Sequence, residues 1–179
     1  MVEIEKKYRL TEERRDEILT VLEEVGAVYD GEDFEENTIY GGGRLENNGG
    51  VVRIRKTQDR SLLTFKRRME NAADVKQQLE YETEVSDVDA AVNIIRELDM
   101  KPQLVYEKRR KIWRLGDVEI VVDELPFGLF MEIEGSITGI KEAEILLEID
   151  DLETENETYP MLTARLGKLT GDRTEARFS

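Results

Sequence analysis

Charged side chains recur at every second position in several short stretches of this 179-residue chain, and each stretch carries one sign of charge. The acidic rows are Glu3 and Glu5; Glu80, Glu82 and Glu84; and Glu132 and Glu134. The basic rows are Arg53 and Arg55; Lys66 and Arg68; and Lys108 and Arg110. Residues two apart share one face of a β-strand. Carboxylates bind hard divalent cations, and Arg and Lys bind phosphate oxygens. The rows therefore have the chemistry of a site for a metal ion and a polyanion.

The residue types that are missing narrow the chemistry. The chain contains no His and no Cys. This excludes disulfides, thiolate chemistry, nucleophilic systems that need an imidazole, and imidazole metal ligands. Any metal must take oxygen ligands, which favours Mg²⁺, Mn²⁺ or Ca²⁺.

The overall charge limits the partners. With 41 acidic and 26 basic residues, the net charge is −15, which argues against general binding to nucleic acid or to an anionic membrane. Residues 53–68 reverse this balance, with seven basic residues and one acidic residue, Asp59. No apolar run is long enough to span a membrane, and the N-terminus lacks the apolar core of a signal peptide. We therefore expect a cytoplasmic protein.

The pattern of the chain predicts one α+β domain over residues 1–179. Seven or eight strands of antiparallel type are expected, because short turns join several of them. They cover residues 2–9, 27–40, 51–57, 60–68, 80–84, 103–114, 118–124 and 129–135. Helices are expected from a cap at Thr11 to Gly26, from a cap at Ser86, over 142–149 and over 159–168. The C-terminal part, about 139–179, is expected to be helical.

Two arrangements of the sheet fit the charged rows. In the first, the charges face water and form weak ion pairs across strands. In the second, the sheet closes into an eight-stranded barrel whose charged face lines a lumen and whose aliphatic face packs outward against helices. Trp113 falls on the opposite face from Lys108 and Arg110, so it is expected to pack. The pattern leaves both arrangements open, and the local excess of basic residues favours the second.

Six blocks of the sequence resemble those of one known family. Glu3-x-Glu5-x-Lys7 is similar to the ExExK signature of the CYTH domain superfamily, also called triphosphate tunnel metalloenzymes. The further blocks, in the family's order, are Val52-Arg53-Ile54-Arg55, Leu63-Thr64-Phe65-Lys66, the acidic strand 80–84, Lys108-Arg109-Arg110, and the hairpin 122–128 with the E-x-E strand 130–134. The resemblance implies an eight-stranded antiparallel tunnel with Mg²⁺ or Mn²⁺.

The resemblance also implies roles for individual residues. Triphosphate binding is expected of Arg53, Arg55, Lys66 and Arg110, with Lys7 and Lys108 beside them and Lys168 as a C-terminal candidate. Metal binding is expected of Glu5, Glu132 and Glu134, with Glu3 and Asp123 close by. Glu82 and Glu84 are expected to face the lumen and to orient or deprotonate water, and Lys7 is expected near the reaction.

These expectations lead to a metal-dependent hydrolase of a triphosphate, either inorganic triphosphate or a compound like thiamine triphosphate. The first alternative is a class IV adenylyl cyclase that makes cyclic AMP and pyrophosphate from ATP, which needs an adenine pocket that no stretch clearly supplies. The second is a non-catalytic module for polyphosphate or nucleotides, against which the carboxylates argue. RNA 5′-triphosphatase activity is disfavoured by the net charge. The expected partner is a small triphosphate, with neither nucleic acid nor membrane. Relatives of the family often form homodimers, although the sequence has no evident dimer interface.

Overall fold

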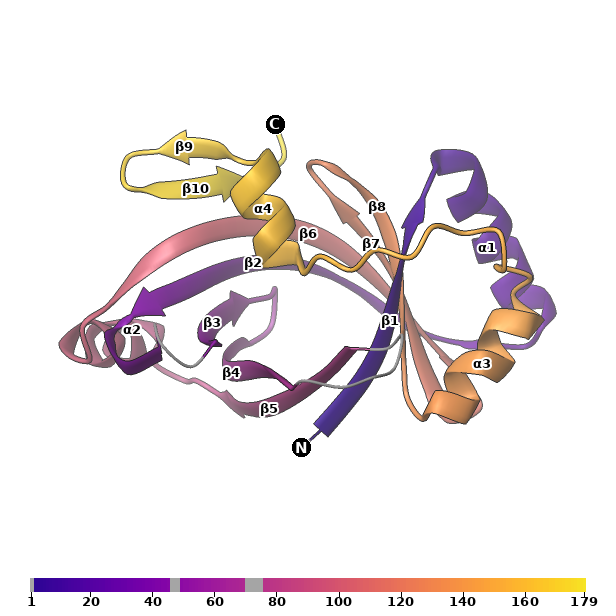
Figure 1. Ribbon diagram of the computed structural model, residues 1–179, viewed down its shortest axis with the longest axis horizontal. Coiled ribbons are helices and arrows are strands. Elements are labelled where there is room, and N and C mark those ends of the chain that lie inside the picture. The colour runs from indigo at the N-terminus through magenta and orange to yellow at the C-terminus, as the bar shows by residue number, and fades with distance from the viewer. Residues whose placement is uncertain (1, 46–48, 70–75) are drawn as a thin grey trace.

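The computed structural model describes residues 2–45, 49–69 and 76–179 (Figure 1). Its strands are β1 (Val2–Leu10), β2 (Val28–Gly42), β3 (Gly50–Lys56), β4 (Ser61–Met69), β5 (Lys76–Glu84), β6 (Met100–Leu115), β7 (Val118–Leu125), β8 (Gly128–Glu134), β9 (Lys168–Thr170) and β10 (Arg173–Ala176). Its helices are α1 (Glu12–Glu24), α2 (Val88–Glu97), α3 (Ile137–Leu146) and α4 (Tyr159–Leu166), with a 3₁₀ turn, η1, at Gly43–Leu45. Within these residues, no helix combines the length and apolarity that crossing a membrane requires.

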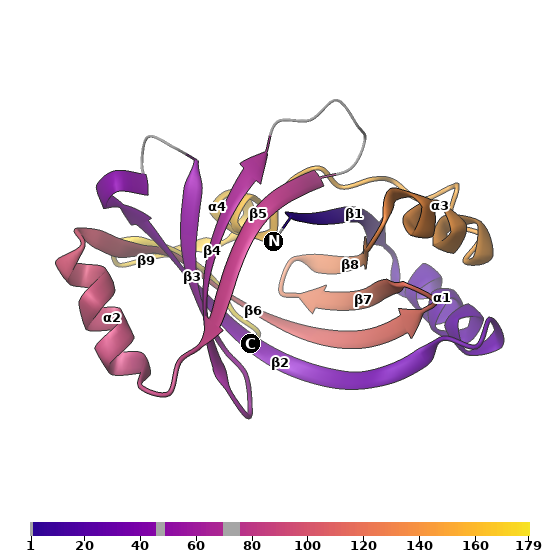
Figure 2. The same cartoon turned by 90° about the horizontal axis from the view of Figure 1, so that it is seen from below.

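The strands form one sheet in the order β2-β3-β4-β5-β1-β8-β7-β6-β10-β9, and an additional pairing joins β2 to β6. This pairing is long, because it runs from Val28 opposite Arg114 to Gly42 opposite Met100. Figure 2 shows β3, β4 and β5 on one side of the molecule and β1, β8 and β7 on the other. The expected antiparallel sheet with helices outside is confirmed. The β1–β5 ladder is short, because only residues 2–5 pair with residues 76–79.

The aliphatic side of the strands packs against α1 and α3. Tyr8 of β1 and Met131 and Ile133 of β8 are buried in one cluster with Ile18 of α1 and Ile140 of α3. Trp113 joins this cluster, so its expected packing role is confirmed. Both helices lie beyond the same end of the sheet in Figures 1 and 2, while α2 lies at the opposite end. The faces left over from this packing are the faces that carry the charged rows.

Side-chain caps fix where the helices begin. The Thr11 side chain accepts a hydrogen bond from the Arg14 amide at 3.2 Å, as the cap predicted there requires. The cap predicted at Ser86 is wrong by one residue, because Asp87 accepts from the Ala90 amide at 2.9 Å. The third helix begins earlier than predicted, because Ser136 accepts from the Gly139 amide. The second and third helices therefore begin where Asp87 and Ser136 cap them, and these positions differ from the predicted starts.

The C-terminal region was predicted to be helical, and this is wrong beyond α4. The helix ends at Leu166, after which β9 and β10 form a hairpin. Strand β10 pairs in parallel with β6, with Thr174 opposite Leu104 and Ala176 opposite Tyr106. This hairpin lies beside α4 in Figure 1 and extends the sheet beyond the eight strands that the sequence suggested.

Candidate functional site

A cavity of about 320 Å³ opens inside the curved sheet and is lined by most of the basic residues that the alternation singled out. All six expected phosphate-binding residues outside the C-terminal region line it, namely Lys7, Arg53, Arg55, Lys66, Lys108 and Arg110. Three carboxylates line it as well: Glu5, Glu132 and Glu134. The rows predicted from period-two alternation thus come together from β1, β3, β4, β6 and β8.

On the β6–β8 side of the cavity, charges form a closely bonded network. Arg110 donates from Nε to Asp123 Oδ1 at 2.7 Å and from Nη2 to Asp123 Oδ2 at 2.6 Å. The same Nη2 donates to Glu132 Oε2 at 2.8 Å, and Lys7 Nζ lies 3.1 Å from the other oxygen of Glu132. Burial would raise the pKa of Glu132, but the charges of Lys7 and Arg110 outweigh it and hold that pKa well below its usual range. Glu132 is therefore ionised and bonded at both oxygens.

Glu35 of β2 holds the next two cations. Its Oε2 lies 3.3 Å from Lys108 Nζ and 3.1 Å from Arg55 Nε. Burial would raise the pKa of Glu35, but the charges of Lys108, Arg55 and Arg110 lower it well below its usual range. Asn37 accepts from Arg55 Nε at 3.1 Å and donates to Glu35. Burial, with Arg110 nearby, lowers the pKa of Lys108 to about 8. A buried carboxylate thus keeps two cations in place beneath the cavity.

On the β3–β5 side, the carboxylates around Arg53 are more distant. Arg53 Nη2 donates to the Thr64 hydroxyl at 3.1 Å and lies 3.4 Å from Glu82 and 3.8 Å from Glu80. Thr64 in turn donates to Glu82 at 2.7 Å. Lys66 pairs with Glu80. These residues come from three neighbouring strands, since Thr64 faces Arg53 across β3–β4 and Glu82 across β4–β5.

Glu5 and Glu134 stand opposite each other on β1 and β8 and form the acidic part of the cavity. Burial, together with the neighbouring carboxylates of Glu5, Glu119 and Glu80, raises the pKa of Glu134 to about 7 against the opposing charge of Lys66. This concentration of negative charge and oxygen donors fits a hard divalent cation. Among the side chains that the structure describes, however, no group of three or more carboxylates is already arranged around a common metal position.

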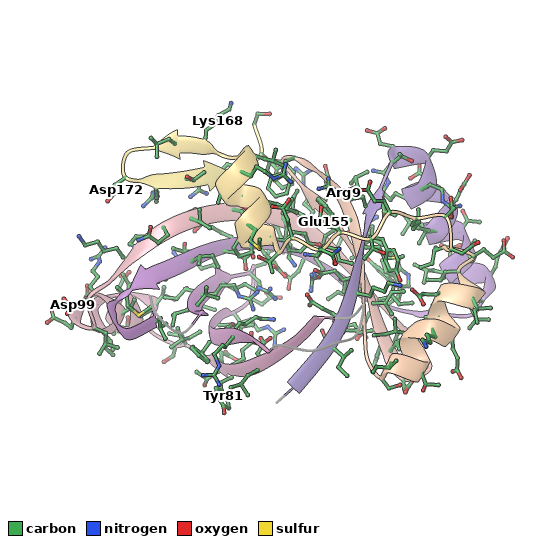
Figure 3. The ribbon with its side chains drawn as sticks, in the orientation of Figure 1. Arg9, Tyr81, Asp99, Glu155, Lys168 and Asp172 are labelled. Carbon is green, nitrogen blue, oxygen red and sulfur yellow. The ribbon has the colours of Figure 1, made fainter. Side chains whose placement is uncertain are left out.

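Four of the expected site residues fit their predicted roles less well. Asp123 and Glu132, expected near or on the metal, are bound by basic side chains instead. Lys168 is exposed on β9 and points away from the sheet in Figure 3, so its predicted place in the tunnel is wrong. Glu84 is exposed and does not line the cavity.

Three further residues of the charged rows are not among the described residues that line the cavity. Glu82 is not among the residues that line the cavity, but its carboxylate lies 3.4 Å from Arg53, which is. The side chains of Glu3 and Arg68 lie outside the described residues.

The sequence interpretation missed Glu35, Asn37 and Tyr159. Glu35 and Asn37 alternate on β2 like the rows that were recognised, and they face Lys108 and Arg55. Extending the alternation through the stretch 27–40 would have found them. Tyr159 reaches the cavity from α4, and no strand periodicity could place it there.

One wall of the cavity is apolar. It is formed by Ile39, Val51, Tyr106, Pro160 and Met161, from β2, β3, β6 and the start of α4. Met161 is 49% exposed, which places this wall next to solvent. An organic group attached to a phosphate chain could therefore be accommodated beside the basic residues.

The CYTH domain family model matches residues 1–159, and the chain belongs to this family. The chain is 24% identical over 152 residues to MJ0240 of Methanocaldococcus jannaschii, named as a candidate adenylate cyclase, with 83% of this chain and 85% of that protein covered. Its fold is similar to that of the PH1012 protein of Pyrococcus horikoshii, with a TM-score of 0.75, 24% identity, and 88% and 96% of the two chains covered.

The fold is also similar to that of HpAC1 from Hippeastrum, at a TM-score of 0.70 and 16% identity, with 97% of this chain and all of that chain (100%) covered. HpAC1 is described as a candidate adenylyl cyclase with a dominant triphosphatase activity. These comparisons agree on the fold and differ in the activities that the relatives' names carry.

Proposed function

We propose that the chain is a divalent-metal-dependent hydrolase of a triphosphate, bound inside a tunnel formed by the eight strands β1 to β8. The observation that carries this proposal is the convergence of six basic side chains on one cavity that also holds Glu5 and Glu134. A protein with a net charge of −15 gathers these cations in one place, and a phosphate chain is the ligand that this arrangement suits. The volume of about 320 Å³ falls within the range of small-molecule sites, roughly 300–1,000 Å³.

The basic residues bind and orient the phosphates in this proposal. Lys7, Lys108 and Arg110 lie on one side of the cavity, and Arg53 and Lys66 come from strands on the other side. Phosphoryl transfer depends on positioning and on stabilising charge as it develops on the phosphate oxygens, so the absence of His is no obstacle.

Glu5 and Glu134 would hold the divalent cation. When bound, the cation would neutralise phosphate oxygens and increase the acidity of the attacking water. Glu82 is the better placed of the two predicted proton acceptors, because its carboxylate lies 3.4 Å from Arg53, which lines the cavity. Lys7, whose Nζ lies 3.1 Å from Glu132, helps to position the phosphate on the β6–β8 side of the cavity.

A second candidate is an adenylyl cyclase, which the apolar wall favours. Ile39, Val51 and Met161 offer the surface for a base that the sequence did not reveal. In this reaction the ribose 3′ oxygen attacks the α-phosphorus of ATP, its hydroxyl proton leaves to a base, and pyrophosphate departs. The relative MJ0240 is named as a candidate adenylate cyclase.

A substrate panel tests the two candidates directly. Inorganic triphosphate, thiamine triphosphate and ATP are each supplied with Mg²⁺ or Mn²⁺, and released phosphate, pyrophosphate and cyclic AMP are measured. We expect phosphate release from inorganic or thiamine triphosphate, with little cyclic AMP from ATP. Cyclic AMP with stoichiometric pyrophosphate would replace the hydrolase by the cyclase. Binding of all three compounds without turnover would support a non-catalytic module.

A further inference from the structure

Tyr159 is the residue through which the C-terminal helix enters the cavity. It is the first residue of α4, and Thr158 caps this helix by accepting from the Met161 amide. The Tyr159 side chain is only 6% exposed, yet it lines the cavity beside Lys7 and Arg110. Because α4 is not one of the strands β1 to β8, the alternation of strand residues does not account for the place of Tyr159 in the cavity.

The Tyr159 hydroxyl completes the bonding of Asp123. It donates to Asp123 Oδ2 at 2.8 Å, and this oxygen also receives Arg110 Nη2 at 2.6 Å and lies 3.4 Å from Lys108 Nζ. The other oxygen of Asp123 accepts from Arg110 Nε. Asp123 is fully buried, so four contacts from neutral and positive groups surround one carboxylate away from water.

The Tyr159 ring lies close to the ammonium groups of two lysines and packs against two other aromatic rings. Lys7 Nζ lies 3.6 Å from the ring centroid and Lys108 Nζ lies 5.3 Å from it. Phe130 meets the ring edge-on at a centroid distance of 5.5 Å, and Tyr106 is tilted at 6.3 Å. Cations placed over an aromatic face are attracted to it, most strongly where water is excluded. The ring therefore gives both ammonium groups a fixed surface.

We propose that Tyr159 is a positioning residue for the triphosphate-binding cations, and that Asp123 is their counter-ion and not a metal ligand. The hydroxyl adds a neutral donor to the carboxylate that Arg110 and Lys108 share, and so helps to fix Asp123 and these two cations in place beside the cavity. The ring holds Lys7 toward the same space. This inference rests on the proposed function, because it assumes that the cavity binds a triphosphate.

The test compares Tyr159→Phe with Tyr8→Phe. Tyr8 is also buried, but its hydroxyl donates to Glu144 on the outer face of the sheet, so it is a matched control. Binding of inorganic tripolyphosphate is measured by calorimetry with EDTA present, and turnover is measured with Mg²⁺. For Tyr159→Phe we expect the Kd and KM to rise by roughly three- to tenfold, the loss typical of one net hydrogen bond, with kcat within about twofold of wild type. Tyr8→Phe should change none of these by more than about twofold.

An Asp123→Asn background tests whether Tyr159 acts through Asp123. In this background, Tyr159→Phe should lose at least half of its effect on Kd, because the two residues form one bonded unit. Calorimetric Mn²⁺ binding to Asp123→Asn should stay within about twofold of wild type, whereas loss of a metal ligand would weaken it by about tenfold or more.

Three outcomes would overturn the inference. They are a Tyr159→Phe variant indistinguishable from Tyr8→Phe, full additivity with Asp123→Asn, and strong loss of Mn²⁺ binding in Asp123→Asn. The Mn²⁺ arm decides the role of Asp123 even if Tyr159→Phe does not fold. A wild-type protein that binds no tripolyphosphate would instead overturn the proposed function, and this inference with it.

Discussion

The two sides of the cavity differ in how tightly their charges are paired. On the β6–β8 side, Lys108, Arg110, Asp123 and Glu132, together with Lys7, have side chains that are at most 14% exposed. Contacts of 2.6–2.8 Å join Arg110 to both carboxylates. Buried charges of this kind are costly unless every partner is present, so this side acts as a fixed framework.

The β3–β5 side is more open at Glu82 and Lys66, and Arg53 is less tightly bonded there, although Arg53 and Glu80 are themselves buried. Glu82 has a side chain that is 36% exposed and Lys66 one that is 23% exposed, and Arg53 lies 3.4–3.8 Å from its carboxylates. The Arg53–Glu82 pair combines a longer distance with an exposed carboxylate, and such pairs contribute little to stability. Under the proposed function, one side sets the geometry of the cavity, while the other offers the less tightly bonded Arg53 to an incoming phosphate.

The largest effect is expected for Arg110→Ala, which removes the centre of the framework. Asp123 and Glu132 would each lose a cation in a buried setting, so the free energy of unfolding should fall by about 3–5 kcal/mol and triphosphate binding should be lost. Denaturant unfolding and calorimetry measure the two effects. Arg109→Ala is the control, because this side chain is 56% exposed and pairs with exposed Glu124, so the change should cost less than about 1 kcal/mol. Equal losses in the two variants would mean that the faces of β6 are assigned the wrong way round.

The next effect is expected for Glu134→Gln, which leaves the framework intact and weakens the acidic end. Mg²⁺-dependent turnover should fall roughly hundredfold, because a carboxylate that holds the cation is replaced by a neutral amide. Folding should be retained, since the two side chains have the same shape. Phosphate release is measured against Mg²⁺ concentration, and the exposed Glu142→Gln on α3 is the control. Turnover and Mg²⁺ dependence like those of wild type would remove Glu134 from the metal site.

The sequence predicted the framework and missed what supports it, for physical reasons. Alternation at period two depends only on strand geometry, so it placed Lys108 and Arg110 inward and Trp113 outward without knowledge of the fold. It could not place Tyr159, because a helix reaches the cavity only through tertiary packing. It also could not show that Asp123 bonds to Arg110, because register between strands decides that pair.

Helix ends and the C-terminal strands were harder to predict. A one-residue difference between Ser86 and Asp87 as the cap depends on local backbone geometry. The short strands β9 and β10 carry weak sequence patterns, and the pairing of β10 with β6 is what stabilises them in the sheet. The predicted elements therefore agree best with the structure in the strands that carry the charged rows.

A smaller effect is expected for Arg53→Ala, which changes the open side. Triphosphate binding should weaken roughly ten- to a hundredfold, because a charge-assisted bond to phosphate is removed. Stability should fall by less than it does in Arg110→Ala, because the partners of Arg53 are more distant and Glu80 keeps Lys66. Calorimetry and denaturant unfolding are compared with Arg67→Ala, an exposed residue on the neighbouring strand β4. A loss of stability as large as that of Arg110→Ala would show that both sides of the cavity are frameworks.

The smallest effect is expected for Lys168→Ala, which tests whether the C-terminal hairpin forms a third side of the cavity. Lys168 is exposed on β9 and does not line the cavity, whereas α4, which precedes it directly, does. The Kd and KM for triphosphate should therefore stay within about twofold of wild type, and the free energy of unfolding within about 0.5 kcal/mol. Calorimetry and turnover measure this beside Tyr159→Phe, so that helix and hairpin are compared in one series. A tenfold loss in Lys168→Ala would mean that the hairpin closes over the cavity when phosphate binds, and the division between a fixed side and an open side would then need a third, mobile element.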